Sequence, residues 1–511
     1  MDADLIIIGS GIGGATLAAA LAPSGLRVLV LEKGQHLRPG PEARDDSAIF
    51  LRGHYAPTEQ WMGSDGTPFV AGNYYAVGGN SKFFGAVMYR YREADFRPRE
   101  HYDGTTPAWP LTYDDLSPWY DAAEQLFHVR GQSGEDPTDP PRSRPYGWPA
   151  VPDEPVIAEV RRRLNTAGAH PASLPLAIDI EAWMAEGRTG WDAYPNTGRG
   201  KIDAESGPLT DALAHPNVTL MTGAEVIRLE TDPEGERITG AVVLHDGEER
   251  TLRAKAYALA AGAIQSAALL LKSANDSYPN GLANGSDQVG RNFMNHNSSA
   301  MLTINPFLRN TSVYQKTLSI NDFYDADPED GAPLGNVQGL GRVTAAVLKS
   351  NMRWLPMPLA RLIAAYAFGW FLQSEDLPDP ESRVSWKDGR IVIHWQRSNM
   401  RAHRKLIART RDLMRRAGFP VVLTRTFGVR TTSHQCGTAR LGTDPATSVV
   451  SPDLRSHDHD NLWITDASVL PTSAAVNPAL TIAALCLRAA PGLRDCLQNT
   501  HGPSTKTGRS A

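Results

Sequence analysis

Two polar residues in the C-terminal part of the chain could carry proton chemistry. His434 lies in Ser433-His434-Gln435-Cys436-Gly437-Thr438, and Asn477 precedes Pro478 at the predicted start of a helix. Histidine is the usual general base near neutral pH, and an asparagine amide can hold a substrate oxygen. Taken singly, His434 is one of fourteen histidines and Asn477 suits a helix N-cap. Their residue types therefore permit general-base catalysis but also fit structural roles.

The first 34 residues predict a dinucleotide-binding βαβ unit. An apolar run ends at Ile8 and is followed by Gly9-Ser10-Gly11-Ile12-Gly13-Gly14, a helical Ala/Leu-rich run and a second apolar run that ends at Glu32. The G-x-G-x-x-G spacing suits a tight turn, close approach of a pyrophosphate, and close packing of helix on strand. Glu32 is expected to bond ribose hydroxyls and to disfavour a 2′-phosphate. The motif alone does not separate FAD from NAD.

The composition fits a globular enzyme with two or three subdomains. The chain has 511 residues, more than one simple core accommodates, with 41% hydrophobic and 21% charged residues. The formal net charge of −5 indicates no broad basic surface for nucleic acid or an anionic membrane.

The cysteines and the apolar segments bear on location. Cys436, Cys486 and Cys496 do not form a disulfide framework, so we expect a reducing, cytoplasmic environment. No secretion signal is expected before the first strand, which begins near residue 4. The stretch from Pro358 to Leu372 is apolar but contains Arg361 and is too short to span a bilayer. We therefore expect no membrane span.

Several later segments have patterns that predict further turns, helices and strands. Gly78 and Gly79 suit close approach of backbone to a flat ligand, although a plain loop before a helix would have the same pattern. The other predicted elements are a capped helix from Thr112 to Phe127, a helix from Pro155 to Gly168, a strand from Thr251 to Leu259, a helix from Gln265 to Lys272, a strand from Asn461 to Asp466 and a helix from Asn477 to Ala489.

A second subdomain is predicted between these segments. Met301 to Gly341 and Ile391 to Arg397 have strand-like patterns, and Arg401 to Ala417 is an amphipathic helix. We expect these elements to form a unit built on a sheet.

Six segments in order resemble the glucose–methanol–choline (GMC) oxidoreductases, a family of FAD enzymes. They are Ile6 to Gly14, Gly78 to Gly85, Ala260 to Ser266, Val289 to His296, His434 to Thr438, and Asp466 with Asn477 to Thr481. The segments run from end to end of the chain. The ordered set is far more specific than any one of its members.

The resemblance implies an α/β fold with a Rossmann-like FAD-binding domain and a second α+β substrate domain on an antiparallel sheet, as in p-hydroxybenzoate-hydroxylase-like proteins. The implied FAD-binding domain comprises 1–145, 208–296 and 433–497. The substrate domain comprises 146–207 and 297–432, and 498–511 form a disordered tail. The implied cofactor-binding residues are Gly9, Ser10, Gly11, Ile12, Gly13, Gly14, Glu32, Lys33, Gly78, Gly79, Asn80, Phe84, Gly85, Ala86, Val226, Ala261, Gly262, Asp466, Ala467, Asn477, Pro478, Ala479 and Thr481.

The chain departs from the family pattern in the second glycine segment. Asn80 and Phe84 stand where many members have Ser and Asn. Some members attach FAD through a histidine here, and residues 78–88 contain none, so FAD is expected to be non-covalent. The second catalytic position, His in some members, is Asn477.

The resemblance implies oxidation of an alcohol to a carbonyl. His434 would accept the hydroxyl proton, the carbinol carbon would pass hydride to flavin N5, and Asn477 would bond the developing alkoxide. O2, a quinone or another acceptor would take the electrons. Cys436 is expected to be a packed residue. No metal is expected, and His457 and His459 are predicted to be solvated.

The substrate is expected to be a sugar, glycoside or amino sugar of the aminoglycoside type, because the compact chain resembles bacterial members acting on such molecules. Two interpretations of the acidic residues from Asp322 to Asp330 are open: they form a solvated loop, or they attract a cationic substrate such as an amino sugar. Alternatives are an apolar, sterol- or terpenoid-like alcohol entering along Pro358 to Leu372, an NAD-dependent dehydrogenase, a flavin fold without turnover, and a flavin monooxygenase. The oligomeric state is left open.

Overall fold

A five-stranded parallel sheet lies at the base of the fold. The computed structural model describes residues 1–428, 431 and 434–499. The strands, in the order β10-β2-β1-β14-β22, are Val218–Thr222, Val28–Glu32, Ala3–Ile8, Ala254–Leu259 and Leu462–Ile464. Every neighbouring pair is parallel. Their apolar runs are buried, as a sheet covered on both faces requires.

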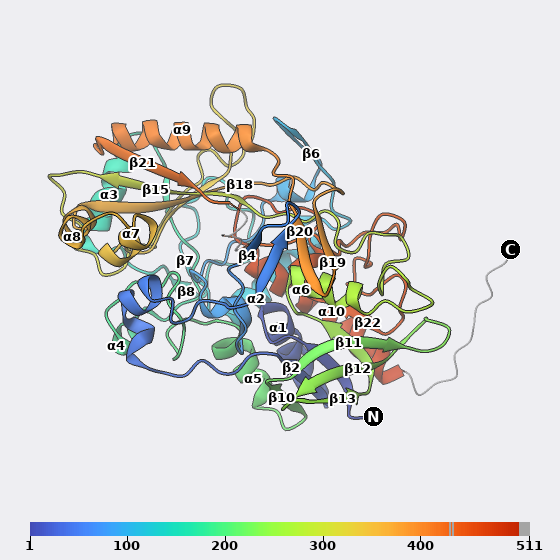
Figure 1. Ribbon diagram of the computed structural model, residues 1–511. Helices are drawn as coiled ribbons and strands as arrows, with labels where there is room; N and C mark the ends of the chain where they lie inside the picture. The colour runs from blue at the N-terminus through green and yellow to red at the C-terminus, as the bar shows by residue number, and fades with distance from the viewer. Residues whose placement is uncertain (429–430, 432–433, 500–511) are drawn as a thin grey trace.

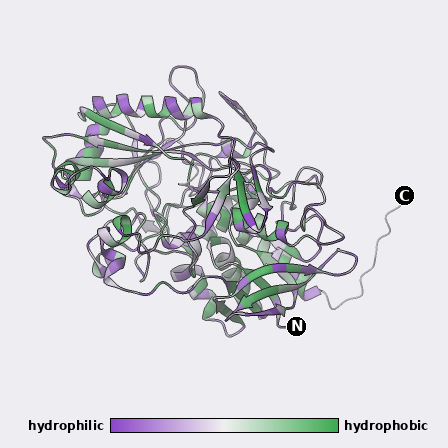
Figure 2. Ribbon diagram, viewed as in Figure 1, coloured by the Kyte–Doolittle hydropathy of each residue, from purple (hydrophilic) through white to green (hydrophobic). Residues whose placement is uncertain are grey.

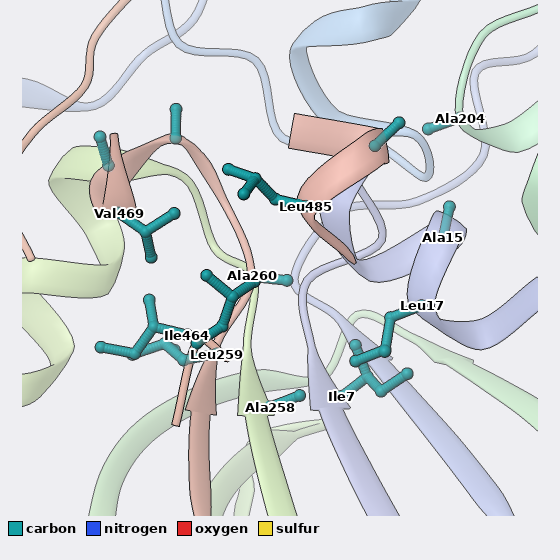
Figure 3. Packing of buried hydrophobic residues seen from close by; sticks show 14 of the residues in the cluster. Ile7, Ala15, Leu17, Ala204, Ala258, Leu259, Ala260, Ile464, Val469 and Leu485 are labelled. Atoms are coloured by element: carbon teal, nitrogen blue, oxygen red, sulfur yellow. The ribbon is translucent and has the colours of Figure 1, made fainter. Parts of the chain in front are cut away.

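Three helices share one buried core with this sheet. They are α1 (Ile12–Leu21), α6 (Ala263–Lys272) and α10 (Ala479–Asn499). Figure 3 shows Leu17 of α1 beside Ile7 of β1, and Ile464 beside Leu259. A Cβ on Gly14 would lie 2.0 Å from the carbonyl oxygen of Gly9, so only glycine allows α1 to approach this closely.

A six-stranded sheet forms the second body. The strands, in the order β21-β15-β18-β17-β16-β9, are Val421–Thr426, Asn297–Ile304, Ala367–Ser374, Asn336–Gly339, Leu318–Ile320 and Pro171–Ser173, and all neighbouring pairs are antiparallel. Met301 packs with the core under α9 (Met400–Arg416) and α3 (Pro155–Thr166), whereas Leu302 packs with α7 (Ala345–Asn351) and α8 (Met357–Ala364). Opposite faces of the sheet therefore carry α9 and the α7–α8 pair (Figure 1).

Smaller elements join these two bodies. They are β11 (Glu225–Thr231), β12 (Ile238–His245) and β13 (Glu248–Leu252) in one sheet, β3 (Gln60–Gly63), β4 (Pro68–Val70), β19 (Arg383–Lys387) and β20 (Arg390–His394) in another, the pairs β5 (Arg99–His101) with β6 (Gly104–Thr106) and β7 (Arg130–Gly131) with β8 (Trp148–Pro149), and the helices α2 (Tyr113–Leu126), α4 (Ile180–Glu186) and α5 (Thr210–Leu213).

The predicted fold class is confirmed, and several predicted elements are found. Thr112 caps α2 through a reciprocal pair with Asp115, as its sequence indicated. The predicted amphipathic helix is α9, along which purple hydrophilic and green apolar residues alternate (Figure 2). In the described part of the chain, none of the helices is long and apolar enough to cross a membrane.

Three element predictions were wrong in detail. Thr251 to Leu259 is divided between β13 and β14, because the first part pairs antiparallel with β12 and the second parallel with β1. The strand near Ile391 is β20, which pairs with β3 and not with the six-stranded sheet. Helix α10 continues past Pro491 to Asn499, since Leu493 and Leu497 beyond the proline are buried.

The predicted domain boundaries stay predictions. Residues 432 and 433, where one predicted boundary falls, and residues 500–511 of the predicted tail lie outside the described residues.

Candidate active site

A cavity of about 740 Å³ lies outside the carboxyl ends of β1 and β14, where ligands bind in open α/β sheets. It extends from Glu32 and Val226 to His434 and Asn477. The sequence-predicted residues that line it are Gly9, Ser10, Gly11, Ile12, Gly13, Glu32, Lys33, Gly78, Gly79, Asn80, Phe84, Gly85, Val226, Ala261, Gly262, His434, Asp466, Ala467, Asn477, Pro478 and Ala479. The exceptions are Gly14, Ala86 and Thr481, which the structure places outside the lining. Gly14 packs against Gly9, and Thr481 Oγ1 bonds the hydroxyl of Tyr120.

The glycine loop before α1 fits a pyrophosphate. Gly11 is the N-cap residue of α1, and no side chain caps this helix end. The first backbone N–H groups of a helix lack partners within the helix and attract anions. A Cβ on Gly11 would meet no atom within 4 Å, so the backbone borders open space in the cavity. These features suit close approach of a dinucleotide phosphate.

Ser10 connects the two glycine loops. Its backbone N–H donates to Glu32 Oε2 (3.1 Å), and its hydroxyl donates to the same oxygen (2.6 Å). Gly78 N donates to Ser10 Oγ (3.0 Å). Glu32 Oε1 accepts from Gly34 N (2.8 Å). The Glu32 carboxylate therefore fixes the loops in addition to facing the cavity, and its predicted bond to a ribose stays a prediction.

The second glycine segment adopts a left-handed turn against the first. Gly78 and Gly79 have φ of +89° and +57°, values that favour glycine, and a Cβ on Gly79 would lie 3.5 Å from the Cα of Gly11. Asn80 Oδ1 accepts from Tyr74 N (2.8 Å), so its side chain shapes the cavity wall. On the opposite wall, Asp466 Oδ2 accepts from Gly262 N (2.9 Å) and holds the turn before α6.

His434 and Asn477 meet at one end of the cavity although 43 residues separate them. Asn477 Nδ2 donates to His434 Nε2 at 3.2 Å. The Asn477 Oδ1 accepts from Gln338 Nε2 (2.7 Å), which orients the amide with its NH2 group toward the histidine. Pro478 and Ala479 continue the lining into α10. The arrangement leaves a nitrogen base and an amide donor side by side.

A second histidine stands behind the first. Met294 and Cys436 exchange backbone hydrogen bonds of 3.0 Å, which holds the two histidine-bearing segments together. His296 Nδ1 lies 2.8 Å from His434 Nδ1, and His296 Nε2 lies 2.9 Å from the carbonyl oxygen of Ser473. A carbonyl only accepts, so His296 carries a proton on Nε2.

This proton placement determines the state of His434. Burial lowers the pKa of His296, which keeps it neutral and leaves its Nδ1 to accept from His434 Nδ1–H. Burial, with a contribution from the Lys316 cation, holds the pKa of His434 well below its usual value. The lone pair of His434 therefore lies on Nε2, where it accepts from Asn477 Nδ2 and borders the cavity. Such a nitrogen can accept a proton at neutral pH.

Two cations line the same region. Lys316 pairs with Asp192 at 2.9 Å, and both side chains line the cavity. Arg342 also lines it, and among the described residues no carboxylate lies within 4.0 Å of its guanidinium. This part of the cavity is therefore not acidic.

The acidic segment from Asp322 to Asp330 does not reach the cavity. Asp327 and Asp330 pair with Lys405 of α9 at 2.8 and 2.6 Å, and Asp327 also pairs with Arg409. Asp322 pairs with His170 at 2.6 Å. The hypothesis that these acids attract a cationic substrate is wrong, because basic side chains of their own body neutralise them.

The prediction for His459 was also wrong. Its side chain is buried, accepts from Ala283 N through Nε2 (2.9 Å) and lies 3.0 Å from the carbonyl oxygen of Gly235 through Nδ1. Across the described residues, no group of three or more His, Cys, Asp or Glu side chains could hold a metal ion.

Sequence reasoning missed the residues that support the pair. His296 ends the family-like segment from Val289, but nothing in that segment indicated a contact with His434. Gln338 of β17 and Gln373 of β18 are buried polar residues on strands, and that unusual placement was the available signal. Tyr74, Lys316 and Arg342 line the cavity without any local pattern.

The chain is similar to known oxidases over nearly its whole length. Family models described as GMC oxidoreductase match residues 161–298 and 378–486, and one described as an NAD(P)-binding Rossmann-like domain matches residues 7–48. The chain is 30% identical to a 6'''-hydroxyparomomycin C oxidase of Streptomyces lividus over 95% of this chain and 90% of that protein. It is 30% identical to a paromamine 6'-oxidase of Streptomyces fradiae over 98% and 92%. A crystal structure of pyridoxine 4-oxidase, titled as from Mesorbium loti, superposes with a TM-score of 0.67 at 19% identity and covers 98% of this chain and 100% of that chain.

Proposed function

The chain belongs to the GMC oxidoreductase family and is an FAD-dependent alcohol oxidoreductase, and from this premise we propose that His434 and Asn477 are its catalytic residues and that its substrate is a sugar- or glycoside-like alcohol. The observation that carries the catalytic assignment is the contact of Asn477 Nδ2 with His434 Nε2 at the end of the cavity. FAD is proposed to be bound non-covalently by the residues that line the rest of the cavity.

His434 is the proposed base. Its Nε2 lone pair accepts the proton of the substrate hydroxyl, and the Asn477 amide donates to the oxygen as negative charge develops there. When bound, FAD supplies the two-electron acceptor for the hydride of the carbinol carbon. The product is a carbonyl compound.

His296 is proposed as a positioning residue for this base. Its Nδ1 accepts from His434 Nδ1–H and so keeps the reactive lone pair on His434 Nε2. Gln373 Oε1 lies 2.9 Å from the same His296 nitrogen. If a proton passes from His434 to His296 Nδ1, the new N–H group can donate to Gln373 Oε1. The Nε2–H group of His296 continues to donate to the carbonyl oxygen of Ser473. The buried pair can hold one added proton without an unpaired N–H group.

The substrate proposal rests on the relatives and on the cavity. The two Streptomyces relatives are named for oxidation of a paromomycin derivative and of paromamine. The polar groups of His434, Asn477, Lys316 and Arg342 suit a molecule with several hydroxyls. An apolar alcohol stays the alternative, because Val343, Val347 and Phe371 also line this end.

We expect a sugar-like alcohol to bleach the visible absorbance of the flavin in anaerobic stopped-flow mixing. The panel holds neutral glycosides, amino sugars, sugar acids and apolar alcohols. Bleaching only by apolar alcohols would overturn the substrate proposal. Recovery on admitting air would assign an oxidase, and recovery only with an added quinone a dehydrogenase. Release of the flavin into the supernatant after acid precipitation would support non-covalent binding.

Gly11→Ala is expected to weaken FAD binding by at least about tenfold, a cost of about 1.4 kcal/mol, without unfolding the protein. Gly11 has φ −68° and ψ −171°, which alanine adopts readily, and the added methyl group meets no protein atom within 4 Å. The methyl would occupy space that the pyrophosphate requires. Titration of the apoprotein with FAD measures the affinity, and thermal unfolding of the apoprotein measures the fold.

Gly492→Ala is the matched control, because this α10 glycine also has no atom within 4 Å of an added Cβ and lies outside the cavity lining. It should leave FAD affinity unchanged. If Gly11→Ala binds FAD as tightly as the parent protein, the pyrophosphate does not lie against this loop.

The predicted division into FAD-binding and substrate domains belongs to the same proposal, with the cavity between the two sheets. The electron acceptor and the cytoplasmic location stay predictions.

A further inference from the structure

The α7–α8 pair lies at one end of the molecule (Figure 1), and it and the loop before α8 carry exposed apolar side chains. Trp354, in the loop before α8, is 78% exposed, and Leu359 and Leu362, on one face of α8, are 44% and 59% exposed. Large apolar side chains at such exposure mark interaction surfaces when they gather in one place. The sequence segment concerned is part of the apolar stretch from Pro358 to Leu372, which the oxidation chemistry leaves unexplained.

Neighbouring segments extend this surface. On the edge strand β21, Val422 packs toward the α9 side, so Val421 and Leu423 face the α7–α8 side, where they are 43% and 52% exposed. Arg425 of β21 donates to Asn351 Oδ1 at the end of α7 (2.7 Å). Asn310 N donates to Ala365 O after α8 (2.8 Å), which brings the loop with the 96%-exposed Phe307 to the same end.

We name these residues the α7–α8 face. Its exposed apolar members are Phe307, Trp354, Leu359, Leu362, Val421 and Leu423, and its exposed basic members are Arg309, Arg353, Arg361 and Arg425. The apolar members are half of the large hydrophobic side chains that are exposed in the described part of the chain.

The charge of the face is opposite to that of the whole chain. The formal net charge of the protein is −5, yet residues 297–321, 331–374 and 413–428, which include every member of the face, contain no Asp or Glu. The four arginines are therefore not offset by acids of their own segments. Arginine beside exposed Trp and Leu is the composition of helices that lie in the interface of an anionic membrane. The negative net charge of the whole chain therefore does not keep this face from an anionic surface.

We propose that the α7–α8 face docks to the surface of a bilayer that contains anionic phospholipid. Trp354, Leu359 and Leu362 would enter the boundary between headgroups and acyl chains, and the arginines would bind the lipid phosphates. No transmembrane segment is required. The occupant is an anionic lipid surface because a purely apolar partner would not explain the excess of arginine.

Docking would place a wall of the cavity at the membrane. Val347 of α7 and Val343, just before it, line the cavity on the inner side of the same helical pair. Phe371 of β18, the strand that follows α8, lines it as well. A lipid-soluble electron acceptor or substrate would then reach the cavity wall without crossing bulk water. This consequence rests on the proposed function of the cavity, whereas the docking itself does not.

The test is co-sedimentation of the FAD-loaded protein with phosphatidylcholine vesicles with and without phosphatidylglycerol. We expect binding only to vesicles that contain phosphatidylglycerol, with release at high salt because exposed charges are screened. The triple variant Trp354→Ser, Leu359→Ser, Leu362→Ser and the double variant Arg353→Glu, Arg361→Glu should each lower the bound fraction at least about tenfold. Tryptophan fluorescence of the parent should shift to the blue on binding, and that shift should be lost in Trp354→Ser.

The matched control replaces exposed apolar residues elsewhere, Leu213→Ser, Leu244→Ser and Trp386→Ser, and should bind like the parent. FAD content and flavin reduction should be unchanged in every variant, because none of the replaced residues lines the cavity. Equal binding by the triple variant overturns the proposal. Absence of binding by the parent protein also overturns it. If light scattering then shows that the parent is a dimer and the triple variant a monomer, the face belongs to an interface between two copies of the chain.

Discussion

His434→Gln is expected to lower the rate of flavin reduction by substrate by about 10²- to 10⁴-fold, the usual range for loss of a general base. Glutamine retains polar atoms near Asn477 and His296 but cannot accept the hydroxyl proton at neutral pH. Because His434 lies at one end of the cavity, the variant should keep its FAD. Anaerobic stopped-flow mixing with the best substrate of the panel measures the rate.

The control for this variant is His394→Gln, an exposed histidine of β20 that bonds Ser64 and lies outside the cavity lining. It should reduce its flavin at the parental rate. A His434→Gln protein that retains FAD and is reduced as fast as the parent would show that His434 is not the base.

The pH dependence of the reaction follows from the same residue. The base must be neutral, and burial holds the pKa of His434 well below its usual value of about 6.5. The rate should therefore be steady around neutral pH and fall only as pH drops through that lowered pKa. An acid limb above 6.5 in the pH profile of flavin reduction would contradict the proposed environment.

His296→Leu is expected to lower flavin reduction by about 10²-fold, since loss of the group that sets a catalytic histidine tautomer can cost up to about 10⁴. Leucine removes the acceptor of His434 Nδ1–H, so the proton can move to Nε2 and block the base. A neutral acceptor on Nδ1–H also stabilises the protonated form of His434, so its loss should lower the pKa of His434 further. The acid limb of the pH profile should therefore move to lower pH.

His296→Gln is the conservative variant, because its amide oxygen can accept from His434 Nδ1–H. It should recover part of the rate that leucine loses. A purely structural role for His296 would reduce FAD content or thermal stability in both variants without moving the acid limb. An unchanged rate and profile in His296→Leu would exclude the positioning role.

Much of the architecture was predictable from local patterns. The βαβ unit around Gly9 to Glu32 and the capping pair of Thr112 and Asp115 fold as their spacing indicated, because short-range sterics and hydrogen bonds decide them. Helix α10 exceeded its predicted end at Ala489 because burial of Leu493 and Leu497 stabilises the turns after Pro491, which the proline itself disfavours.

The surroundings of the candidate site depended on contacts that no local pattern encodes. His434 and Asn477 lie in segments that match the family pattern. No pattern in the sequence indicated that His296, 138 residues from His434, would contact it. From its composition, the acidic segment near Asp327 could have attracted a cationic substrate. In the folded protein Asp327 instead forms ion pairs with Lys405 and Arg409 of α9. In each instance the meaning of a charged or polar residue depended on which element packed against it.

By itself the sequence determined the glycine loops that suit a dinucleotide, because backbone conformation there follows from residues within a few positions of one another. The ordered match of six segments to one family implied the type of fold and the two polar residues proposed for catalysis. The tertiary structure alone decided which nitrogen of His434 faces the cavity, which groups hold Asn477, and that an apolar, arginine-bearing face lies behind the cavity wall. Those outcomes depend on the pairing of strands and helices far apart in the chain, because the burial and the hydrogen-bond partners of a side chain are properties of the packed molecule.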